Sequence, residues 1–592
     1  METIRNRQRM RPRYFLWAAG IAAVTLMGCR KAETEQSDFD HFLQQEFVSA
    51  MESDYTTLHV YLQDPKAHGI DMDQVEIGLG MRPDPEGLEA QKKDVRDSYE
   101  ELKRFNRNLL TEEQKDIYDS YEWQLGLEQE AADEVYDYYP SLFGSMTGIH
   151  YQIPTLLADW EIRTEEDVQN LITVVEDVKP YVETALEYTK IQEEKGLLML
   201  DLDSVIQYCT SILDKGEDSA VLQSMDAAIG QAGLDEKTAG QYREMLRSAF
   251  LESVLPAYEE IRDTMVQFQS GNNQEEGLAN LEHGKDYYEI LFKQSIGSDR
   301  SVEDIKAMME EELQEHALRL SEIVNENPSL AEAASMPETG FEDYYEILDH
   351  IKERMSADFP EVGQLDYNIE TISEEIASDS GVTAYFNIPP LDGDSEKQLR
   401  VNPKTNDIAS LNTYQTVAHE GFPGHMYQYA YMYENLNTPF QKAILNNPAY
   451  TEGYATYAQY EAGRYLDGID ADWLQLYQEN DLMTNCLVIL MDIGIHYEGW
   501  SMEDMGSFLD DFGLGTDEES LEGMYRQLQA NPCAFEPYYV GYFEIENLKE
   551  QAQESLGERF DQKKFHEAIL KGGNVSFPVV EKNVTAYIEA NR

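Results

Sequence analysis

The segment Ala418-His419-Glu420-Gly421-Phe422-Pro423-Gly424-His425 constrains the backbone more than any other stretch of this sequence. In the widespread H-E-x-x-H motif the histidines are four residues apart on one helical face, whereas His419 and His425 are six apart, roughly 240° around a regular helix. Pro423 and Gly424 lie inside this interval, where proline removes a helical hydrogen bond and glycine permits unusual dihedral angles. We therefore expect a bulge of about two residues that returns both imidazoles to one face. The alternative is that Pro423-Gly424 ends a helix and the histidines are unrelated.

These residue types are the ligands of a hydrolytic zinc site. Zinc binds neutral imidazole nitrogens and carboxylate oxygens, and catalytic sites leave one position open for a water molecule, whose pKa the metal lowers. We expect His419, His425 and Glu452 to hold one zinc ion, Glu452 lying in the downstream segment Thr451-Glu452-Gly453-Tyr454-Ala455. Glu420, next to the first histidine, is placed to act as general base toward that water.

The N-terminus has the parts of a bacterial secretion signal. Five arginines between residues 5 and 13 precede the apolar run 14–27, which ends at Gly28-Cys29. The run is shorter than the roughly 18 apolar residues of a membrane-spanning helix. It resembles a lipobox, which implies cleavage before Cys29 and lipidation of its thiol; a plain signal peptide or an uncleaved anchor is the alternative. We predict a signal peptide at 1–28, a tether at 29–38 and an exported body at 39–592, lipid-anchored to the outer face of the bacterial cell membrane or cell envelope.

The charge balance narrows the classes of partner. The chain has 114 acidic and 45 basic residues, a formal charge of −69. Because phosphate binding requires a basic surface, nucleic acid is excluded as a partner. We interpret the acidity as a solvated surface, with recognition of cationic substrates as the alternative. The cysteines beyond Cys29 show no paired metal-site spacing, and Cys486, in an apolar run, is expected to be a buried thiol.

Helical periodicity dominates the first half of the chain, from about Phe39 to Phe268. Thr164 with Asp167 resembles a capping box, and apolar residues follow at helical spacing as far as Pro180, with a second apolar face beyond it and a stop near Gly196. The polar stretch 270–274 is a candidate seam between lobes 39–270 and 271–592, or a surface loop within one lobe. The sequence therefore predicts an all-α, large helical body.

Strand signals concentrate just before the histidine motif. Val382–Phe386 and Gln398–Asn402 alternate as short strands do, and the segment 389–393 between them is rich in turn-forming residues. We expect a small β-hairpin or sheet beside the zinc helix. It either covers this helix or holds an extended peptide along its edge by backbone pairing.

Several motifs beyond the histidine segment carry a resemblance to a known family. They are Glu452–Ala455, Asp492–His496 with Gly499–Ser501, Tyr538–Gly541, Phe565-His566, Gly572-Gly573, Gly284–Tyr288 and the early Asp64–Gly69. With His419–His425, they make the chain resemble the bacterial proteins catalogued as domain of unknown function 885, which are regarded as candidate zinc metallopeptidases. The resemblance spans nearly the whole mature chain.

The resemblance implies that His419, His425 and Glu452 are zinc ligands and that Glu420 is the general base. It also suggests an all-α, two-lobed body with a deep central cleft. The sequence departs from the family at three positions: Tyr454 replaces a usual tryptophan, Gln459 a frequent glutamate, and Val488 a common arginine. These departures leave the metal chemistry intact but put substrate preference, and a carboxylate-binding arginine, in doubt.

Two further residues are candidates for catalysis. Zinc peptidases commonly stabilise the developing oxyanion with a tyrosine or histidine, and Tyr538 and His496 are available for this role. Each also has a structural interpretation, because Tyr538 lies among other aromatic residues and His496 is positioned to bond Asp492. Arg400, in the second expected strand, is either an exposed arginine or a ligand for a substrate carboxylate.

The sequence therefore predicts a membrane-anchored, zinc-dependent peptidase that hydrolyses short peptides, either carboxypeptidase-like or oligopeptidase-like. One alternative is a non-catalytic peptide-binding lipoprotein, against which the intact Glu420 argues, since binding alone needs no base. The other is a metal-dependent hydrolase of a non-peptide amide, which would use the same residues.

Overall fold

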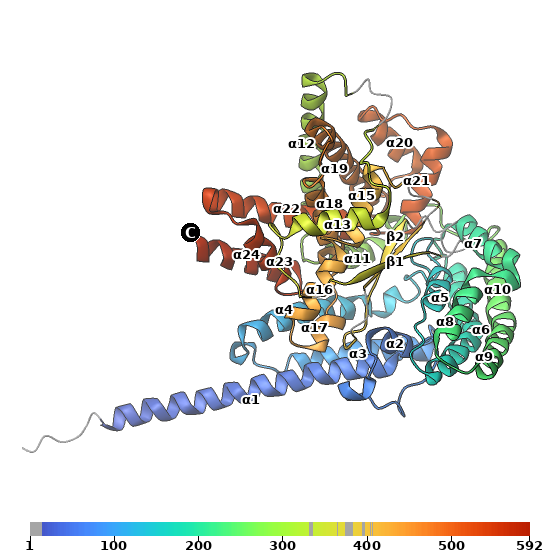
Figure 1. The fold of residues 1–592 in the computed structure, drawn as a ribbon, viewed down its shortest axis with the longest axis horizontal. Helices are drawn as coiled ribbons and strands as arrows, with labels where there is room; N and C mark the ends of the chain where they lie inside the picture. The colour runs from blue at the N-terminus through green and yellow to red at the C-terminus, as the bar shows by residue number, and fades with distance from the viewer. Residues whose placement is uncertain are drawn as a thin grey trace, which may run out of the picture.

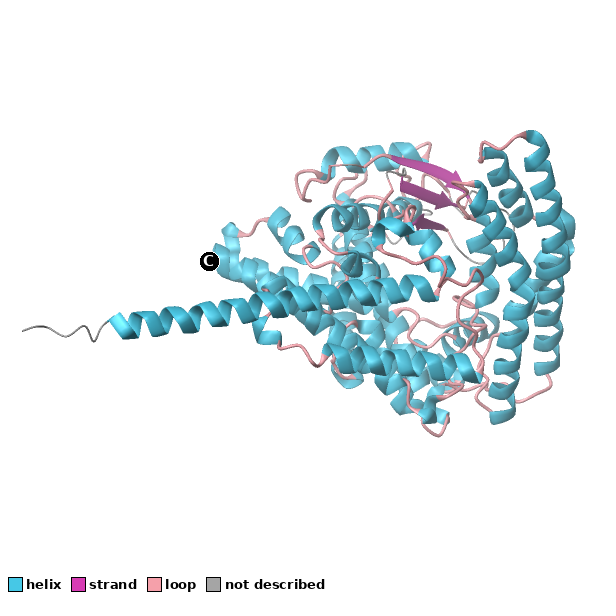
Figure 2. Ribbon diagram, turned by 90° about the horizontal axis from the view of Figure 1, so that it is seen from below, coloured by secondary structure: helices cyan, strands magenta, loops and turns pink. Residues whose placement is uncertain are grey.

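The computed structural model describes residues 15–330, 336–363, 365–372, 383–393, 397–402, 404 and 407–592, with side chains from residue 31 onward. Helices make up most of this part of the chain and surround a three-stranded sheet (Figures 1 and 2). The prediction of an all-α body with a small sheet is confirmed.

The N-terminal helix α1 (Phe15–Ser53) extends away from the body at its first half, as Figure 2 shows. The segment 29–38 is helical and part of α1, and burial begins at Phe39. Just before this point the side-chain amide of Gln36 donates to the Leu109 carbonyl at 2.8 Å. Within the described residues, no helix is both long and apolar enough to cross a membrane.

The first half of the chain continues as a series of helices, one of which begins at the capping box expected from the sequence. Thr164 forms the capping box with Asp167 at the start of α6, and Gly196 ends this helix in a left-handed conformation. These helices are α2 (Tyr55–Tyr61), α3 (Pro85–Leu102), α4 (Glu112–Ala131), α5 (Ile149–Ala158), α6 (Glu165–Lys195), α7 (Leu202–Lys215), α8 (Ala220–Gln231), α9 (Glu236–Ala249), α10 (Leu255–Phe268), α11 (Gly284–Ile296), α12 (Val302–Glu326) and α13 (Tyr344–Met355), with a π-helical segment at Phe250–Val254.

Pro180 lies inside α6 and does not end it. Proline lacks the N–H that would bond the carbonyl four residues earlier. Here the Ser253 hydroxyl donates to the Glu176 carbonyl at 3.0 Å and accepts the Lys179 N–H at 2.9 Å. A residue from a distant helix therefore supplies the missing hydrogen bond, and α6 runs unbroken for 31 residues.

The sheet has the order β1-β3-β2, with β1 (Tyr367–Thr371) parallel and β2 (Ala384–Asn387) antiparallel to β3 (Lys397–Val401). The two expected strands are therefore confirmed as the pair β2 and β3, although Val382 lies outside the described residues. Strand β1 was not predicted. Since β3 is central, β2 is an edge strand.

The second half of the chain contains the helices that carry the histidine motif and its surroundings. The segment 270–274 is the turn after α10, and its Asn273 and Gln274 hydrogen-bond back to Leu200 and Leu198. The helices of this half are α15 (Leu411–Glu420), α16 (His425–Asn435), α17 (Pro439–Ala443), α18 (Pro448–Gly463), α19 (Ala471–Ile493), α20 (Met502–Asp511), α21 (Glu518–Ala530), α22 (Glu536–Leu556), α23 (Gln562–Leu570) and α24 (Phe577–Asn591), with a π-helical segment at Gly494–Glu498.

Helices α18 and α22 approach each other closely because two glycines face one another. A Cβ atom on Gly453 would lie 2.3 Å from the carbonyl carbon of Gly541, and one on Gly541 would lie 2.1 Å from the Ala449 oxygen. Only glycine fits at such backbone contacts. The contact fixes Glu452 of α18 and Tyr538 of α22 in neighbouring turns of packed helices.

Candidate metal centre

The histidine motif occupies an interrupted helix rather than one continuous helix. Helix α15 ends at Glu420 and α16 begins at His425, with a cis peptide bond between Phe422 and Pro423. Across the break, Gly424 N–H donates to the Ala418 carbonyl at 3.0 Å and Tyr427 N–H to the Gly421 carbonyl at 3.3 Å. Both hydrogen bonds span six residues instead of four, which is the excess of two residues that the spacing predicted.

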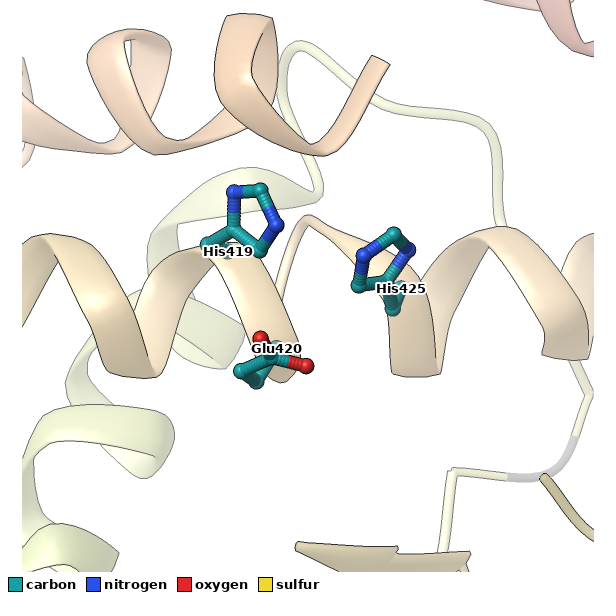
Figure 3. A group of neighbouring side chains, drawn as sticks. All are labelled: His419, Glu420 and His425. Carbon is teal, nitrogen blue, oxygen red and sulfur yellow. The ribbon is translucent and has the colours of Figure 1, made fainter. Parts of the chain in front are cut away.

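Two glycines allow this interruption. A Cβ atom on Gly424 would lie 1.8 Å from the His419 carbonyl oxygen, and one on Gly421 would lie 2.4 Å from Leu348 Cδ2. The two imidazole rings consequently meet, with centroids 4.8 Å apart and planes at 87°. Figure 3 shows the rings on either side of the break, with Glu420 at the end of α15 below His419. Helix α15 does end at this motif, as the alternative expected, but the two histidines still lie side by side.

Glu452 completes the group from α18. Its Oε2 atom lies 3.3 Å from His419 Nε2 and 3.1 Å from His425 Nε2. The three residues expected to bind zinc therefore converge on one point, although they come from three different helices.

The outer nitrogen of each imidazole contacts an amide oxygen. His419 Nδ1 is 3.0 Å from Gln459 Oε1, and His425 Nδ1 is 3.4 Å from Gln428 Oε1. Because an amide oxygen only accepts, these contacts favour a proton on each Nδ1, which leaves each Nε2 free to bind a metal ion. Fixing the ring by its second nitrogen is the usual arrangement around metal-binding histidines. Gln459, one of the three positions at which the sequence departs from the family it resembles, makes the contact to His419.

A cation would be stabilised where these groups meet, because two imidazole nitrogens lie against a carboxylate. Without a metal, a proton on His425 takes this place: burial would lower the pKa of His425, but the charge and hydrogen bond of Glu452 raise it to about 9. Burial would raise the pKa of Glu452, but the charge of His425 and bonds from both imidazoles lower it. The donor set thus fits a zinc ion, which prefers such nitrogen and oxygen ligands.

Glu420 stands beside this group with a separate role. One of its carboxylate oxygens lies within 4.8 Å of one ring nitrogen of His419 and one ring nitrogen of His425. Its Oε2 atom accepts the N–H of Phe386 in β2 at 2.9 Å. Its enclosed position raises the pKa of the Glu420 carboxyl, and the neighbouring imidazoles partly offset this.

The structure brings Tyr538 to the group and does not bring His496. The Tyr538 ring stacks on His419 with centroids 6.0 Å apart, and burial raises the pKa of its hydroxyl. His496 is fully buried elsewhere: its Nδ1 accepts the Leu278 N–H at 3.2 Å and its Nε2 donates to the Leu528 carbonyl at 3.1 Å. Both ring nitrogens are thereby used by the backbone, with Asp492 4.0 Å from Nε2.

A cavity of about 540 Å³ opens in front of Glu420, His425, Glu452 and Tyr538. Sequence reasoning expected the strand β2 beside this site but missed the parts of the wall that come from α5, the loop before it and α16. Thr451 was detectable by its position next to Glu452, but the α5 residues are more than 250 positions away in sequence and carry no motif. The remaining lining residues are Met146, Tyr151, Gln152, Thr155, Ala384, Tyr385, Phe386, Ile388, Tyr429 and Thr451.

Arg400 is neither exposed nor available. Its side chain is 14% exposed and pairs with Asp159 at 3.2 Å and with Glu370. Val488, at the other position considered for a cation, packs against the hydrophobic core. Cys486 is buried, as expected.

The fold and the site define a helical protein with a candidate metal centre of two histidines and a glutamate, flanked by a second glutamate. Its sequence matches the family described as "Bacterial protein of unknown function (DUF885)" over residues 75–584. This span is well over half of the chain, and the chain belongs to this family. Among curated proteins, none matches the sequence.

Two solved structures share the fold. A candidate lipoprotein from Colwellia psychrerythraea aligns with a TM-score of 0.80 and 19% identity, covering 94% of this chain and 99% of that one. A candidate lipoprotein of unknown function from Shewanella oneidensis aligns with a TM-score of 0.64 and 15% identity, covering 91% and 98%. A candidate oligoendopeptidase F from Bacillus anthracis aligns with a TM-score of only 0.32 and 11% identity, covering 86% and 97%, and this similarity carries no argument.

Proposed function

We propose that this protein is a zinc-dependent peptidase. The observation that carries the proposal is the arrangement of four side chains, three of which converge while the fourth lies beside them. The Nε2 atoms of His419 and His425 converge on Glu452 within 3.3 Å. Glu420 lies beside them but is held apart by the Phe386 N–H. Three ligands with one additional carboxylate is the composition of a catalytic zinc site.

His419, His425 and Glu452 would hold the metal. A zinc ion bound there supplies an open coordination position at which the pKa of a water molecule falls toward neutrality. Glu420 accepts a proton from the attacking water and passes it to the leaving amine. The Phe386 N–H orients the Glu420 carboxylate for this transfer.

Tyr538 is the candidate donor to the substrate. Tyr538 lines the cavity, and the raised pKa keeps its hydroxyl protonated. A protonated phenol can donate to the substrate carbonyl oxygen as negative charge develops there, and preorganised donors of this kind stabilise the transition state.

The edge strand β2 provides a surface for an extended peptide. Phe386 N–H points to Glu420, and the Thr383 carbonyl accepts from Asn402 next to β3. Since backbone groups alternate along a strand, Ala384 and Phe386 direct theirs away from β3 and toward the cavity. A substrate strand could pair there, with its scissile bond beside Glu420.

We also propose that the mature protein is an exported lipoprotein attached through Cys29. The support is the arginine-rich and apolar N-terminus followed by Gly28-Cys29. The two structures that share the fold are described as candidate lipoproteins.

Metal analysis and digestion of a mixed peptide library test the enzymatic proposal together. We expect one zinc per chain and cleavage of short peptides that stops with a chelator and returns with added zinc. Peptide binding without cleavage by the zinc-loaded protein would favour a binding lipoprotein instead. Cleavage of amides other than peptides alone would favour the non-peptide hydrolase.

A further inference from the structure

We infer that the site cuts peptide bonds inside a chain, next to large apolar or aromatic side chains, and does not recognise a substrate's C-terminal carboxylate. This inference rests on the proposed peptidase function and specifies its substrate class. It separates the oligopeptidase-like interpretation from the carboxypeptidase-like one, which the sequence left open.

The charges lining the cavity are the first argument. Glu420 and Glu452 are acidic, and none of the other described residues that line the cavity is a lysine or arginine. A divalent cation held by the cluster would balance these two carboxylates and leave no excess positive charge. The C-terminal carboxylate of a peptide would therefore find no positively charged partner in this cavity. Because burying an unpaired carboxylate costs free energy, the cavity disfavours the C-terminal end of a peptide.

Arg400 does not provide the missing partner. It lies in register with Tyr385 of the cavity wall but pairs with Asp159 and Glu370. The Tyr385 hydroxyl also donates to Asp159, at 2.5 Å. The carboxylates of Asp159 and Glu370 therefore compensate the charge of the Arg400 guanidinium. Arg400 packs behind the cavity wall and is not one of the residues that line the cavity.

The segments that flank β2 cannot contribute a cation either. Residues 373–382 and 394–396 lie outside the described residues, and their sequences contain five acidic residues but no lysine or arginine: Glu374, Glu375, Asp379, Asp394 and Glu396. With a whole-chain charge of −69, the surrounding potential further disfavours an anionic substrate end.

The apolar part of the lining indicates what the cavity accepts. Five aromatic rings share the wall with Met146 and Ile388: those of Tyr151, Tyr385, Phe386, Tyr429 and Tyr538. The volume of about 540 Å³ lies within the roughly 300–1,000 Å³ of pockets that hold small ligands. A peptide segment with a large apolar side chain fits this surface, while the backbone of β2 holds the chain extended.

End-blocked peptides test the inference. One peptide sequence with a central phenylalanine is prepared with free ends, N-acetylated, C-amidated and blocked at both ends, and cut sites are read by mass spectrometry with zinc-loaded protein. We expect the same internal bond to be cut in all four, with kcat/KM within about threefold, and a loss of at least about tenfold when phenylalanine is replaced by aspartate.

The outcomes separate this inference from the proposed function. Loss of cleavage on amidation, or stepwise trimming from either end, would overturn the inference and leave the peptidase function standing. If zinc-loaded protein cuts none of the four peptides and no member of the mixed library, the proposed function itself fails.

A gain of charge gives a second test. Gln152 is an exposed residue of the cavity wall, and Gln152→Lys places a cation there. We expect the ratio of kcat/KM for the free over the amidated C-terminus to rise about tenfold. The matched control, Gln231→Lys at the exposed end of α8, should leave this ratio unchanged. An unchanged ratio in Gln152→Lys would contradict the charge argument.

Discussion

The Nδ1 atoms of the two histidines contact the amide oxygens of Gln459 and Gln428. These contacts leave both Nε2 atoms for a metal ion. In the proposed site, the ligands are therefore oriented by residues that do not bind the metal themselves. At the residue scale, the account therefore makes separate predictions for the ligands and for the groups that orient them.

His425→Ala or Glu452→Ala should abolish zinc binding at one ion per chain while leaving the helical circular-dichroism signal nearly unchanged. The reason is that each removes one of three ligands, whereas the helical core is packed independently of the cluster. Metal analysis after gel filtration provides the measurement. Full zinc retention by either variant would exclude that residue as a ligand.

Gln459→Leu should weaken zinc binding by about 10–100-fold, the usual cost of losing a partner that orients a ligand. Leucine is similar in size but cannot accept the His419 Nδ1 proton. Gln459→Glu, which restores an acceptor, should bind zinc at least as well as the wild type. Competition titration with a chromophoric chelator compares the three proteins, and equal affinities in all would remove Gln459 from the site.

The interrupted helix is the feature that matters most at the scale of elements. Gly424→Ala should lower the melting temperature and the zinc content together, since the added Cβ would meet the His419 carbonyl oxygen at 1.8 Å. The control is Gly240→Ala in α9, where nothing lies within 4 Å, and alanine should be neutral or stabilising by up to about 1 kcal/mol. Normal zinc binding in Gly424→Ala would contradict the importance of the break.

Elements with a local chemical signal were predictable from the sequence, and those that depend on distant partners were not. The break followed from Pro423-Gly424, the start of α6 from Thr164, and the β2–β3 pair from alternation and turn residues. Strand β1 has five residues with a weak pattern and pairs in parallel with β3. The passage of α6 through Pro180 depends on Ser253, which no local pattern reveals.

The same distinction applies to the candidate site. The three expected ligands and Glu420 lie in two short motifs, and the structure brings them together. His496 could not be separated from Tyr538 by sequence, because both occur in motifs on buried helices. The packing of α18 on α22 places Tyr538 over His419, whereas the packing around residues 494–498 leaves His496 bonded to the backbone of Leu278 and Leu528.

At the scale of the whole molecule, this strongly acidic chain buries some of its carboxyl groups in the core. Asp492 and Glu536 are fully buried and lie close together beside Cys533, with one carboxyl oxygen of each within 4.8 Å of the other. Asp492 also accepts from the Tyr288 hydroxyl at 2.7 Å. Burial raises the pKa of both carboxyls.

This pair predicts a pH dependence of stability. The unfolded chain releases a carboxyl proton above the ordinary glutamate pKa of about 4.3, whereas the folded state keeps it up to the raised folded pKa. Between these two pKa values the free energy of unfolding therefore falls as pH rises, by up to about 1.4 kcal/mol per pH unit. Glu536→Gln has no such proton to lose. Its stability relative to wild type, from urea unfolding between pH 5 and 8, should increase with pH, whereas the exposed control Glu558→Gln should give a constant difference. A pH-independent difference for Glu536→Gln would contradict a raised pKa of this buried pair.

The central claim is that Glu420 acts on the water and does not merely pack beside the metal, and one measurement tests it most directly. Peptide hydrolysis is compared between wild type and Glu420→Gln, both loaded with one zinc per chain. Glutamine keeps the shape and can accept the Phe386 N–H, but it cannot take a proton from water. We expect zinc content to stay unchanged and kcat to fall by about 10²–10⁴-fold. Hydrolysis by the zinc-loaded variant within a few-fold of wild type would contradict the account.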